Sequence, residues 1–493
     1  MQTVSAFFKT AHTFNHEIMK KRPLLILILW FFSLYCLAQN GTPLQLEFPC
    51  SQYSTELQCI PCQAQGVCVF YPTQINDSSH IQLAQYNVNL EFVNRCQFAI
   101  APQLSFAASH YSDNCVYLLY QNKNKRHRET EGQLFCYHCD SHQIEATELK
   151  SLPINDITQF SVHNGAIYFV SATGRDNTNL FFGANGQPFT KSLFLNNAPD
   201  YTIDCYHIDT VNQKVLTCVN TASGTRNNVI WLAELTLQGE PLRIIDLPDT
   251  GSVRFQNARI AQMDSSRYLI TGTYQIRKNG LNNTASGKYT TIYENGHCST
   301  PNLYPFNSAR SVNTNAVSNE VLYLTSRTYY DSSRYVTIAE SFYPEYRYST
   351  TYSYGVPTSE PIFVGYRFLN AEIHVFNQDD SLLWQYTFPF DNLLVTNLTT
   401  HLRADFIGSN MLFYYILNQS MTTMLVDEHL EIIDPIRTSE IFPSNKSNVS
   451  STYTTGITRW YKDYFLLVGC RIPKSGNNKN SKTSYFINKL KYE

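Results

Sequence analysis

The chain has 493 residues and carries 37 Lys and Arg against 39 Asp and Glu, so its formal net charge is −2. The lack of a basic excess argues against nucleic-acid binding. A chain with 43% hydrophobic and 14% aromatic residues is expected to fold rather than to remain disordered.

The first 38 residues have the pattern of a secretory signal peptide. A basic cluster at residues 20–22 precedes an apolar run that ends at Ala38, and this basic, apolar, small order is typical of such signals. The run has about 15 residues, whereas a membrane-spanning helix needs about 20. We therefore expect residues 1–38 to be removed, with Met19 as the initiator, and the mature protein to be secreted or to lie in the periplasm or cell envelope. An uncleaved N-terminal anchor is the alternative, and no later segment is apolar enough to span a membrane.

Residues 39–79 are expected to form a short cysteine-rich arm, too short for a core of its own. The segment shows no clear strand pattern and contains Cys50, Cys59, Cys62 and Cys68. Of the 13 cysteines in the chain, 12 remain once Cys36 leaves with the signal. An even number in an exported protein favours disulfides.

Cys59 and Cys62 of this arm form a Cys-x-x-Cys motif. A second such motif, Cys136 and Cys139, falls in an expected strand. Residues three apart in a strand point to opposite faces of the sheet, so the two cysteines are expected to form disulfides with separate partners in the segment 50–68. The alternatives are a four-cysteine zinc site that joins "CIPCQAQGVC" to "CYHC" and a redox site, which usually opens a helix. The export signal favours disulfides, so we predict no metal and no cofactor.

A turn followed by a short apolar run recurs along the rest of the chain, as in "SDNCVYLLY", "HNGAIYFVS" and "DSSRYLITG". Aligned on one position, the copies fall at Val116, Ile167, Val215, Tyr268, Val321, Glu372, Leu412 and Tyr464. Most copies are followed by two more apolar runs separated by Gly, Asn or Asp, which are signals of strands and hairpins. A unit of about 50 residues with roughly four strands is typical of a β-propeller.

The repeat predicts an all-β chain whose residues 80–493 form a β-propeller with eight blades, or seven as the alternative. The last unit lacks a fourth strand because the chain ends after "SYFINKLKY". The alternating segment 80–93 is expected to join the last blade and close the ring. A pair of β-sandwiches or a β-solenoid is the other interpretation. The segment "NQDDSLLWQYTF", 377–388, resembles one repeat of the quinoprotein-type propellers, and this resemblance implies the fold without a cofactor.

The segment "CYHIDTVNQKVLTC" predicts a hairpin in which Asp209 pairs with Lys214 and Cys205 lies opposite Cys218. Opposed residues on adjacent strands approach to about 4.5 Å between their Cα atoms, close to the range that disulfides require. A disulfide between Cys205 and Cys218 is therefore expected.

The chain lacks the sequence motifs of common catalytic and nucleotide-binding sites, such as Gly-x-Ser-x-Gly, the Walker loop and His-Glu-x-x-His. Its one basic run, "NKNKRHRE" at 122–129, is expected to be a solvated loop tip. Tyrosines are dense at 327–355. They are expected to stabilise a blade as cross-strand partners, and contact with a sugar or a protein is the alternative.

These observations favour an exported, non-catalytic binding protein whose ligand is a protein or a glycan at the mouth of the propeller channel. The alternative is a secreted glycan hydrolase or lyase with its site at the same mouth. An enzyme is expected to show a deep pocket with converging titratable groups, and a binding protein a broad aromatic face.

Overall fold

The computed structural model describes residues 45–49, 57–75, 78–122, 129–153, 156–172, 178–184, 189–191, 201–221, 229–248, 253–276, 285–306, 312–314, 317–319, 321–331, 333–353, 356–417, 420–441, 449–473 and 484–491. The proposed signal peptide, its initiator and its cleavage site lie outside these residues. Among the described residues, no helix has the length and hydrophobicity needed to cross a membrane.

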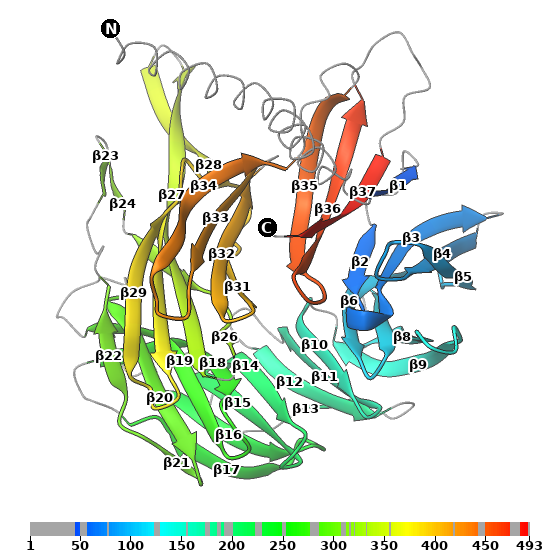
Figure 1. Cartoon of the computed structure of the whole chain (residues 1–493), viewed down its shortest axis with the longest axis horizontal. Coiled ribbons are helices and arrows are strands. Elements are labelled where there is room, and N and C mark those ends of the chain that lie inside the picture. Colours follow the sequence, from blue (N-terminus) through cyan, green and yellow to red (C-terminus); the bar gives the residue numbers. More distant parts are fainter. Residues whose placement is uncertain are drawn as a thin grey trace, which may run out of the picture.

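The described chain is all-β and forms eight antiparallel sheets, each built on a path of four hydrogen-bonded strands (Figure 1). We number the sheets in chain order. Sheet 1 contains β2 (Gln58–Pro61), β3 (Val67–Ile75), β4 (Ser78–Tyr86) and β5 (Phe92–Ala99), with a 3-10 turn at Gln63–Gln65. Sheet 2 contains β6 (Leu104–Ser112), β7 (Cys115–Asn122), β8 (Glu129–His138) and β9 (Ile144–Pro153).

Sheets 3 to 5 continue in the same order along the chain. Sheet 3 contains β10 (Ile157–His163), β11 (Ala166–Ala172), β12 (Thr178–Ala184) and β13 (Thr190–Lys191). Sheet 4 contains β14 (Tyr201–Asp209), β15 (Lys214–Thr221), β16 (Ile230–Thr236) and β17 (Pro241–Asp246). Sheet 5 contains β18 (Val253–Gln262), β19 (Arg267–Ile276), β20 (Gly287–Glu294) and two short strands that both pair with β20, namely β21 (His297–Cys298) and β22 (Asn302–Pro305).

Sheets 6 to 8 complete the set. Sheet 6 follows a two-stranded hairpin, β23 (Val312–Thr314) and β24 (Val317–Asn319), and contains β25 (Leu322–Thr325), β26 (Tyr329–Tyr330), β27 (Arg334–Ser353), β28 (Val356–Asn377), β29 (Leu382–Pro389) and β30 (Leu394–Val395). Sheet 7 contains β31 (Arg403–Ile407), β32 (Asn410–Leu417), β33 (Ser420–Val426) and β34 (Ile432–Glu440). Sheet 8 contains β35 (Val449–Arg459), β36 (Tyr464–Pro473), β37 (Ser484–Lys491) and the first strand of the chain, β1 (Gln45–Pro49).

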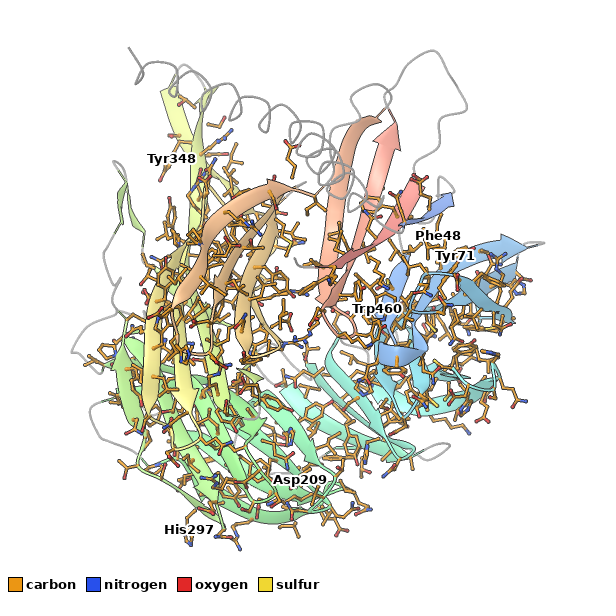
Figure 2. The ribbon with its side chains drawn as sticks, in the orientation of Figure 1. Phe48, Tyr71, Asp209, His297, Tyr348 and Trp460 are labelled. Atoms are coloured by element: carbon orange, nitrogen blue, oxygen red, sulfur yellow. The ribbon has the colours of Figure 1, made fainter. Side chains whose placement is uncertain are left out.

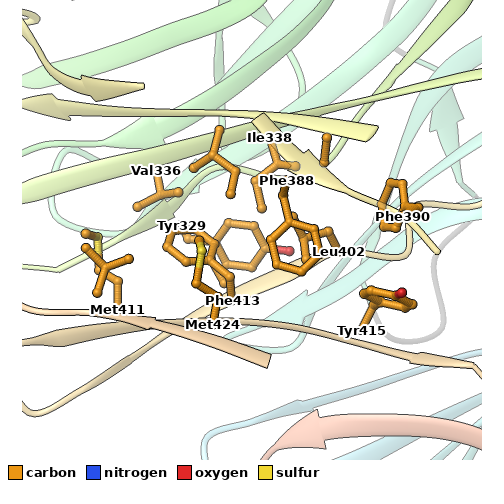
Figure 3. Close-up of a cluster of buried hydrophobic side chains, with 14 of the residues drawn as sticks. Tyr329, Val336, Ile338, Phe388, Phe390, Leu402, Met411, Phe413, Tyr415 and Met424 are labelled. Atoms are coloured by element: carbon orange, nitrogen blue, oxygen red, sulfur yellow. The ribbon is translucent and has the colours of Figure 1, made fainter. Parts of the chain in front are cut away.

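The hydrophobic core lies between successive sheets. Buried clusters join sheets 1 and 2, 2 and 3, and so on to 7 and 8, and a further cluster joins sheet 8 back to sheet 1. Figure 3 shows the cluster between sheets 6 and 7, where Phe388 packs with Phe413 and Met424. Both faces of a sheet are therefore covered. In β36, for example, Leu466 faces sheet 1 and the next residue, Leu467, faces sheet 7.

This two-sided burial explains why the second strand of most sheets reads as a continuous apolar run. Side chains of a strand alternate between its faces, and a strand with one wet face would alternate apolar and polar residues. Four-stranded sheets packed face to face in chain order are the units that the sequence repeat predicted.

The prediction that residues 80–93 complete the last sheet is wrong. Half of that segment, residues 80–86, belongs to β4, which pairs with β3 and β5 inside sheet 1. The strand that completes sheet 8 is β1, paired with β37 so that Phe48 lies opposite Tyr485. Alternating hydrophobicity marks a strand but does not encode its partner.

The prediction of an arm without strands at 39–79 is also wrong. This segment supplies β1, β2 and β3, so sheet 1 begins inside it. In the repeat alignment, the copies at Val321 and Glu372 both map to sheet 6, the first beside β25 and the second on β28. The predicted number of units equals the number of sheets only because two errors cancel. Sheet 6 was counted twice, and sheet 1 was missed.

Candidate functional site

Two features stand out from the regular packing of the sheets: a long hairpin in sheet 6 and a group of cysteines in sheets 1 and 2. The hairpin consists of β27 and β28, which pair along their whole length from Arg334↔Asn377 to Ser353↔Val356. Their neighbours are much shorter. The last pairing of β25 is with Phe342, and β30 pairs with β28 at Tyr366 and Arg367. Residues 345–353 and 356–365 therefore form a two-stranded ribbon that projects beyond the sheet (Figure 1).

The ribbon exposes large apolar side chains. Tyr346, Tyr348, Ile362 and Phe363 are 47%, 53%, 55% and 43% exposed, and Figure 2 shows Tyr348 on the projecting part. Tyr346 lies opposite Phe363 in the register, and their rings meet edge to face with centroids 5.7 Å apart. The ribbon thus carries an aromatic pair in which each residue is nearly half exposed.

The base of the ribbon is fixed to sheet 6 by polar contacts. The Arg367 guanidinium forms an ion pair with Glu345 across the two strands and donates to Asn392 Oδ1 at 2.5 Å. The hydrogen bond from Arg367 lowers the pKa of Glu345. The tyrosines nearer the sheet, such as Tyr335 and Tyr343, are buried, as expected for packing within a blade. Tyr346 has the expected cross-strand partner in Phe363, but Tyr346 and Tyr348 are exposed.

Three cysteine sulphurs come together between sheets 1 and 2, from positions that the sequence analysis named. The Sγ atoms of Cys62, Cys68 and Cys139 lie within 4.8 Å of one another, and all three residues are buried. Cys62 precedes the 3-10 turn, Cys68 lies on β3, and Cys139 directly follows β8. We call this set the buried cysteine cluster.

The three thiols of the buried cysteine cluster shift one another's pKa values in opposite directions. Hydrogen bonds from Cys62 and Cys68 lower the pKa of Cys139 to about 4. The same contacts with Cys139 raise the pKa of Cys62 and of Cys68. One thiolate is therefore stabilised at the expense of the other two.

A second cluster lies on the other face of sheet 2. Cys115 Sγ is 3.2 Å from Nδ1 of His138, and Cys136 Sγ is 3.7 Å from Nε2 of the same ring. Glu145 approaches His138 Nε2 at 3.6 Å. Burial raises the pKa of Cys136 to about 12. Cys136 and Cys139 thus belong to different clusters, as expected for residues three apart. The sequence analysis missed the grouping of Cys115 with His138. The signal available for it was that these two residues lie opposite each other in the β7–β8 hairpin.

The remaining cysteine predictions stand as follows. Cys205 and Cys218 are Cα partners in the β14–β15 hairpin, and Asp209 pairs with Lys214, so the predicted register is confirmed. No disulfide joins two of the described cysteines, Cys59 among them, and disulfide formation stays a prediction. Cys50 lies outside the described residues, as does most of the basic run between β7 and β8.

Among the described residues, the titratable groups with strongly shifted pKa values do not line the cavities beside sheet 2 and between sheets 7 and 8. Burial lowers the pKa of Lys288 and brings that of His374 to about 3, and both side chains are inside the protein between sheets 5 and 6. A cavity of about 330 Å³ lies instead between sheets 7 and 8, with Arg437, Glu440 and Lys491 in its lining. It offers a single carboxylate.

No protein-family model matches the chain, and no curated protein is similar in sequence. Solved structures with a similar arrangement include the polysaccharide lyase Uly1 (TM-score 0.40, 9% identity, covering 80% of this chain and 91% of that one) and the β-propeller domain of the trilobed protease from Pyrococcus furiosus (TM-score 0.37, 8% identity, 75% and 90%). Prolyl oligopeptidase B from Galerina marginata is similar over 86% of this chain and 56% of its own length, with a TM-score of 0.41 and 8% identity.

Proposed function

We propose that this chain is an exported, non-catalytic binding protein: an eight-bladed β-propeller that holds a protein partner through the ribbon at residues 345–353 and 356–365. The observation that carries the proposal is the exposed aromatic and aliphatic surface of that ribbon. The cycle of eight inter-sheet clusters supports ring closure, and the signal pattern of residues 1–38 supports export.

A protein is favoured over a glycan by the shape of the ribbon. Isolated two-stranded hairpins are marginally stable in water, and the ribbon leaves the outer edges of both strands without a neighbouring strand among the described residues. Such edges pair readily with an added strand, and pockets for alternate side chains then give specificity. Ile362 adds aliphatic surface that suits a protein interface better than a sugar ring.

The proposal is tested by affinity capture with the full chain as bait against the envelope and culture-medium fractions of its own host. The wild type is compared with Tyr346→Ser/Tyr348→Ser/Phe363→Ser. The matched control is Leu242→Ser/Leu383→Ser/Ile433→Ser, which removes three exposed apolar side chains from other strands. Aromatic anchors at interfaces often contribute 2 kcal/mol or more, so we expect the ribbon variant to retain less than roughly a tenth of the partner and the control to retain it all.

Loss of the partner from both variants, or from neither, would contradict binding by the ribbon. Capture of a glycan instead of a protein would support a binding function but would show that the ligand is a glycan.

The second candidate function is a glycan hydrolase or lyase, and the cavity between sheets 7 and 8 is the feature that favours it. Glycoside hydrolysis generally uses two carboxyl groups, whereas Glu440 is the one carboxylate in the lining of this cavity. We expect no turnover of host-envelope glycans by the purified chain. Turnover that is lost in Glu440→Gln would establish the enzyme.

A further inference from the structure

We propose that Cys62, Cys68 and Cys139 bind one thiophilic d10 cation, Zn²⁺ or Cu⁺, at the junction of sheets 1 and 2. This inference goes beyond partner binding and does not depend on it. It competes with the expectation that these cysteines form disulfides, and with the expectation that the protein holds no metal.

The first two sulphurs are positioned by a tight turn. Cys62 N–H donates to the Gly66 carbonyl at 2.8 Å, and Gln65 N–H donates to the Cys62 carbonyl at 2.9 Å. Gly66 has a φ of 100°, and a Cβ at this position would lie 1.9 Å from the Tyr86 carbonyl oxygen. The turn is therefore closed against β4, and it returns the chain so that Cys68 comes back beside Cys62.

The third sulphur belongs to Cys139, which lies in a turn of sheet 2 that has its own backbone hydrogen bonds. Cys139 N–H donates to the Asn114 carbonyl at 2.9 Å, and His142 N–H donates to the His138 carbonyl at 2.8 Å. The two turns are also tied to each other, because Gln65 Nε2 donates to Asp140 Oδ1 at 2.7 Å. Three ligands on two fixed turns form a preorganised site.

The separation of the sulphurs suits a shared cation. A metal–sulphur distance of about 2.3 Å places the sulphurs of a tetrahedral or trigonal site roughly 3.8–4.0 Å apart, and the three Sγ atoms lie within 4.8 Å of one another. A disulfide requires about 2.05 Å and joins only two sulphurs. Because the number of sulphurs is odd, any disulfide within the cluster leaves one thiol buried among apolar side chains such as Phe70 and Leu83.

The donor set selects the class of cation. Thiolates are soft ligands that favour Zn²⁺ and Cu⁺ over Mg²⁺ or Ca²⁺, and the cluster contains no carboxylate. Each thiol that binds releases its proton to solvent, including the Cys62 thiol that otherwise donates to the Ile60 carbonyl at 3.3 Å. Three sulphurs complete a trigonal site for Cu⁺, whereas Zn²⁺ takes a fourth ligand.

The experiment measures metal per chain by elemental mass spectrometry on the full chain, purified without chelator after export by its own N-terminal segment. We expect about one equivalent of zinc or copper, and the element found identifies the cation. Cys139→Ser is expected to lose the metal. The control Cys298→Ser changes a half-buried cysteine of sheet 5 and is expected to retain it.

A second measurement on the wild type keeps the test valid if Cys139→Ser does not fold. Thiol alkylation followed by peptide mapping is performed before and after treatment with a strong chelator. The site is supported if all three cysteines are protected from alkylation before the chelator is added and react after it. A chain without zinc or copper, a disulfide between any two of the three cysteines, or equal metal loss from Cys298→Ser would overturn it.

Discussion

Glu340 is a fully buried carboxyl group that joins sheet 6 to the segment preceding β31. Its oxygens accept the backbone N–H of His401 at 2.8 and 3.0 Å and that of Leu402 at 2.7 Å. Burial raises the pKa of Glu340 from 4.5 to about 8, and the two backbone hydrogen bonds oppose this shift. The protonated form is therefore the stable one in the folded protein at neutral pH.

This shift predicts the direction of a pH dependence. Between pH 4.5 and about 8 the folded chain holds a proton that the unfolded chain has lost, so the contribution of Glu340 to stability falls as pH rises through this window and is constant above it. In Glu340→Gln the decline should be smaller, by up to about 1.4 kcal/mol per pH unit. Denaturant unfolding at several pH values measures it, with the exposed Glu360→Gln as control. Parallel curves for wild type and Glu340→Gln would refute the assignment.

Gly66 and Gly165 allow a matched test of the turn that carries Cys62. Both have positive φ, 100° and 76°, but a Cβ at Gly165 would meet no atom within 4 Å, whereas one at Gly66 would overlap the Tyr86 carbonyl. Gly165→Ala should cost about 1 kcal/mol of unfolding free energy, from backbone strain alone. Gly66→Ala should cost about 3 kcal/mol or more, because the turn must also move away from β4. Equal costs in denaturant unfolding would show that the contact with Tyr86 is absent.

At the scale of the elements, β1 is the strand that joins the N-terminal part of the chain to sheet 8. Phe48 on β1 is buried and packs edge to face on Tyr86 of sheet 1, with ring centroids 6.0 Å apart. Phe92 contacts the same ring at the same distance but is 57% exposed. The two phenylalanines therefore differ in burial and not in aromatic contact.

Phe48→Ala should lower the free energy of unfolding by about 2–4 kcal/mol, because it opens a cavity between sheets 8 and 1. Phe92→Ala should lower it by less than about 1 kcal/mol. Chemical unfolding of both variants measures the difference. A small effect of Phe48→Ala would mean that β1 does not close the junction.

The elements differ in how far the sequence predicts them. The Cys205–Cys218 register was predictable because turn chemistry and hairpin pairing act over a few residues. The role of 45–49 was not, because its partner β37 lies hundreds of residues away. The role of 80–93 was misassigned, although its partners are neighbours in the chain, because many segments satisfy the period of a strand. The ribbon was visible only as a run of tyrosines, and their exposure depends on how far β25 and β30 extend.

At the scale of the whole molecule, the N-terminal and C-terminal parts of the described chain meet between sheets 8 and 1. Trp460 Nε1 donates to the Gly66 carbonyl at 2.7 Å, and Lys489 Nζ donates to the Val88 carbonyl at 2.6 Å. Figure 2 shows Trp460 and Phe48 in this region. A repeat period predicts many similar sheets but not the contact that joins the last to the first, since the carbonyls of Gly66 and Val88 that accept these hydrogen bonds lie outside the repeated phrase.

We propose that the ribbon of sheet 6 contacts a protein partner. The most direct test replaces Tyr348 with the photo-crosslinking residue p-benzoylphenylalanine in the host and irradiates intact cells. The control places the same residue at Ile433, which is equally exposed on sheet 7. We predict one protein adduct from position 348 and none of that mass from position 433. No adduct from position 348, or the same adducts from both positions, would contradict the claim.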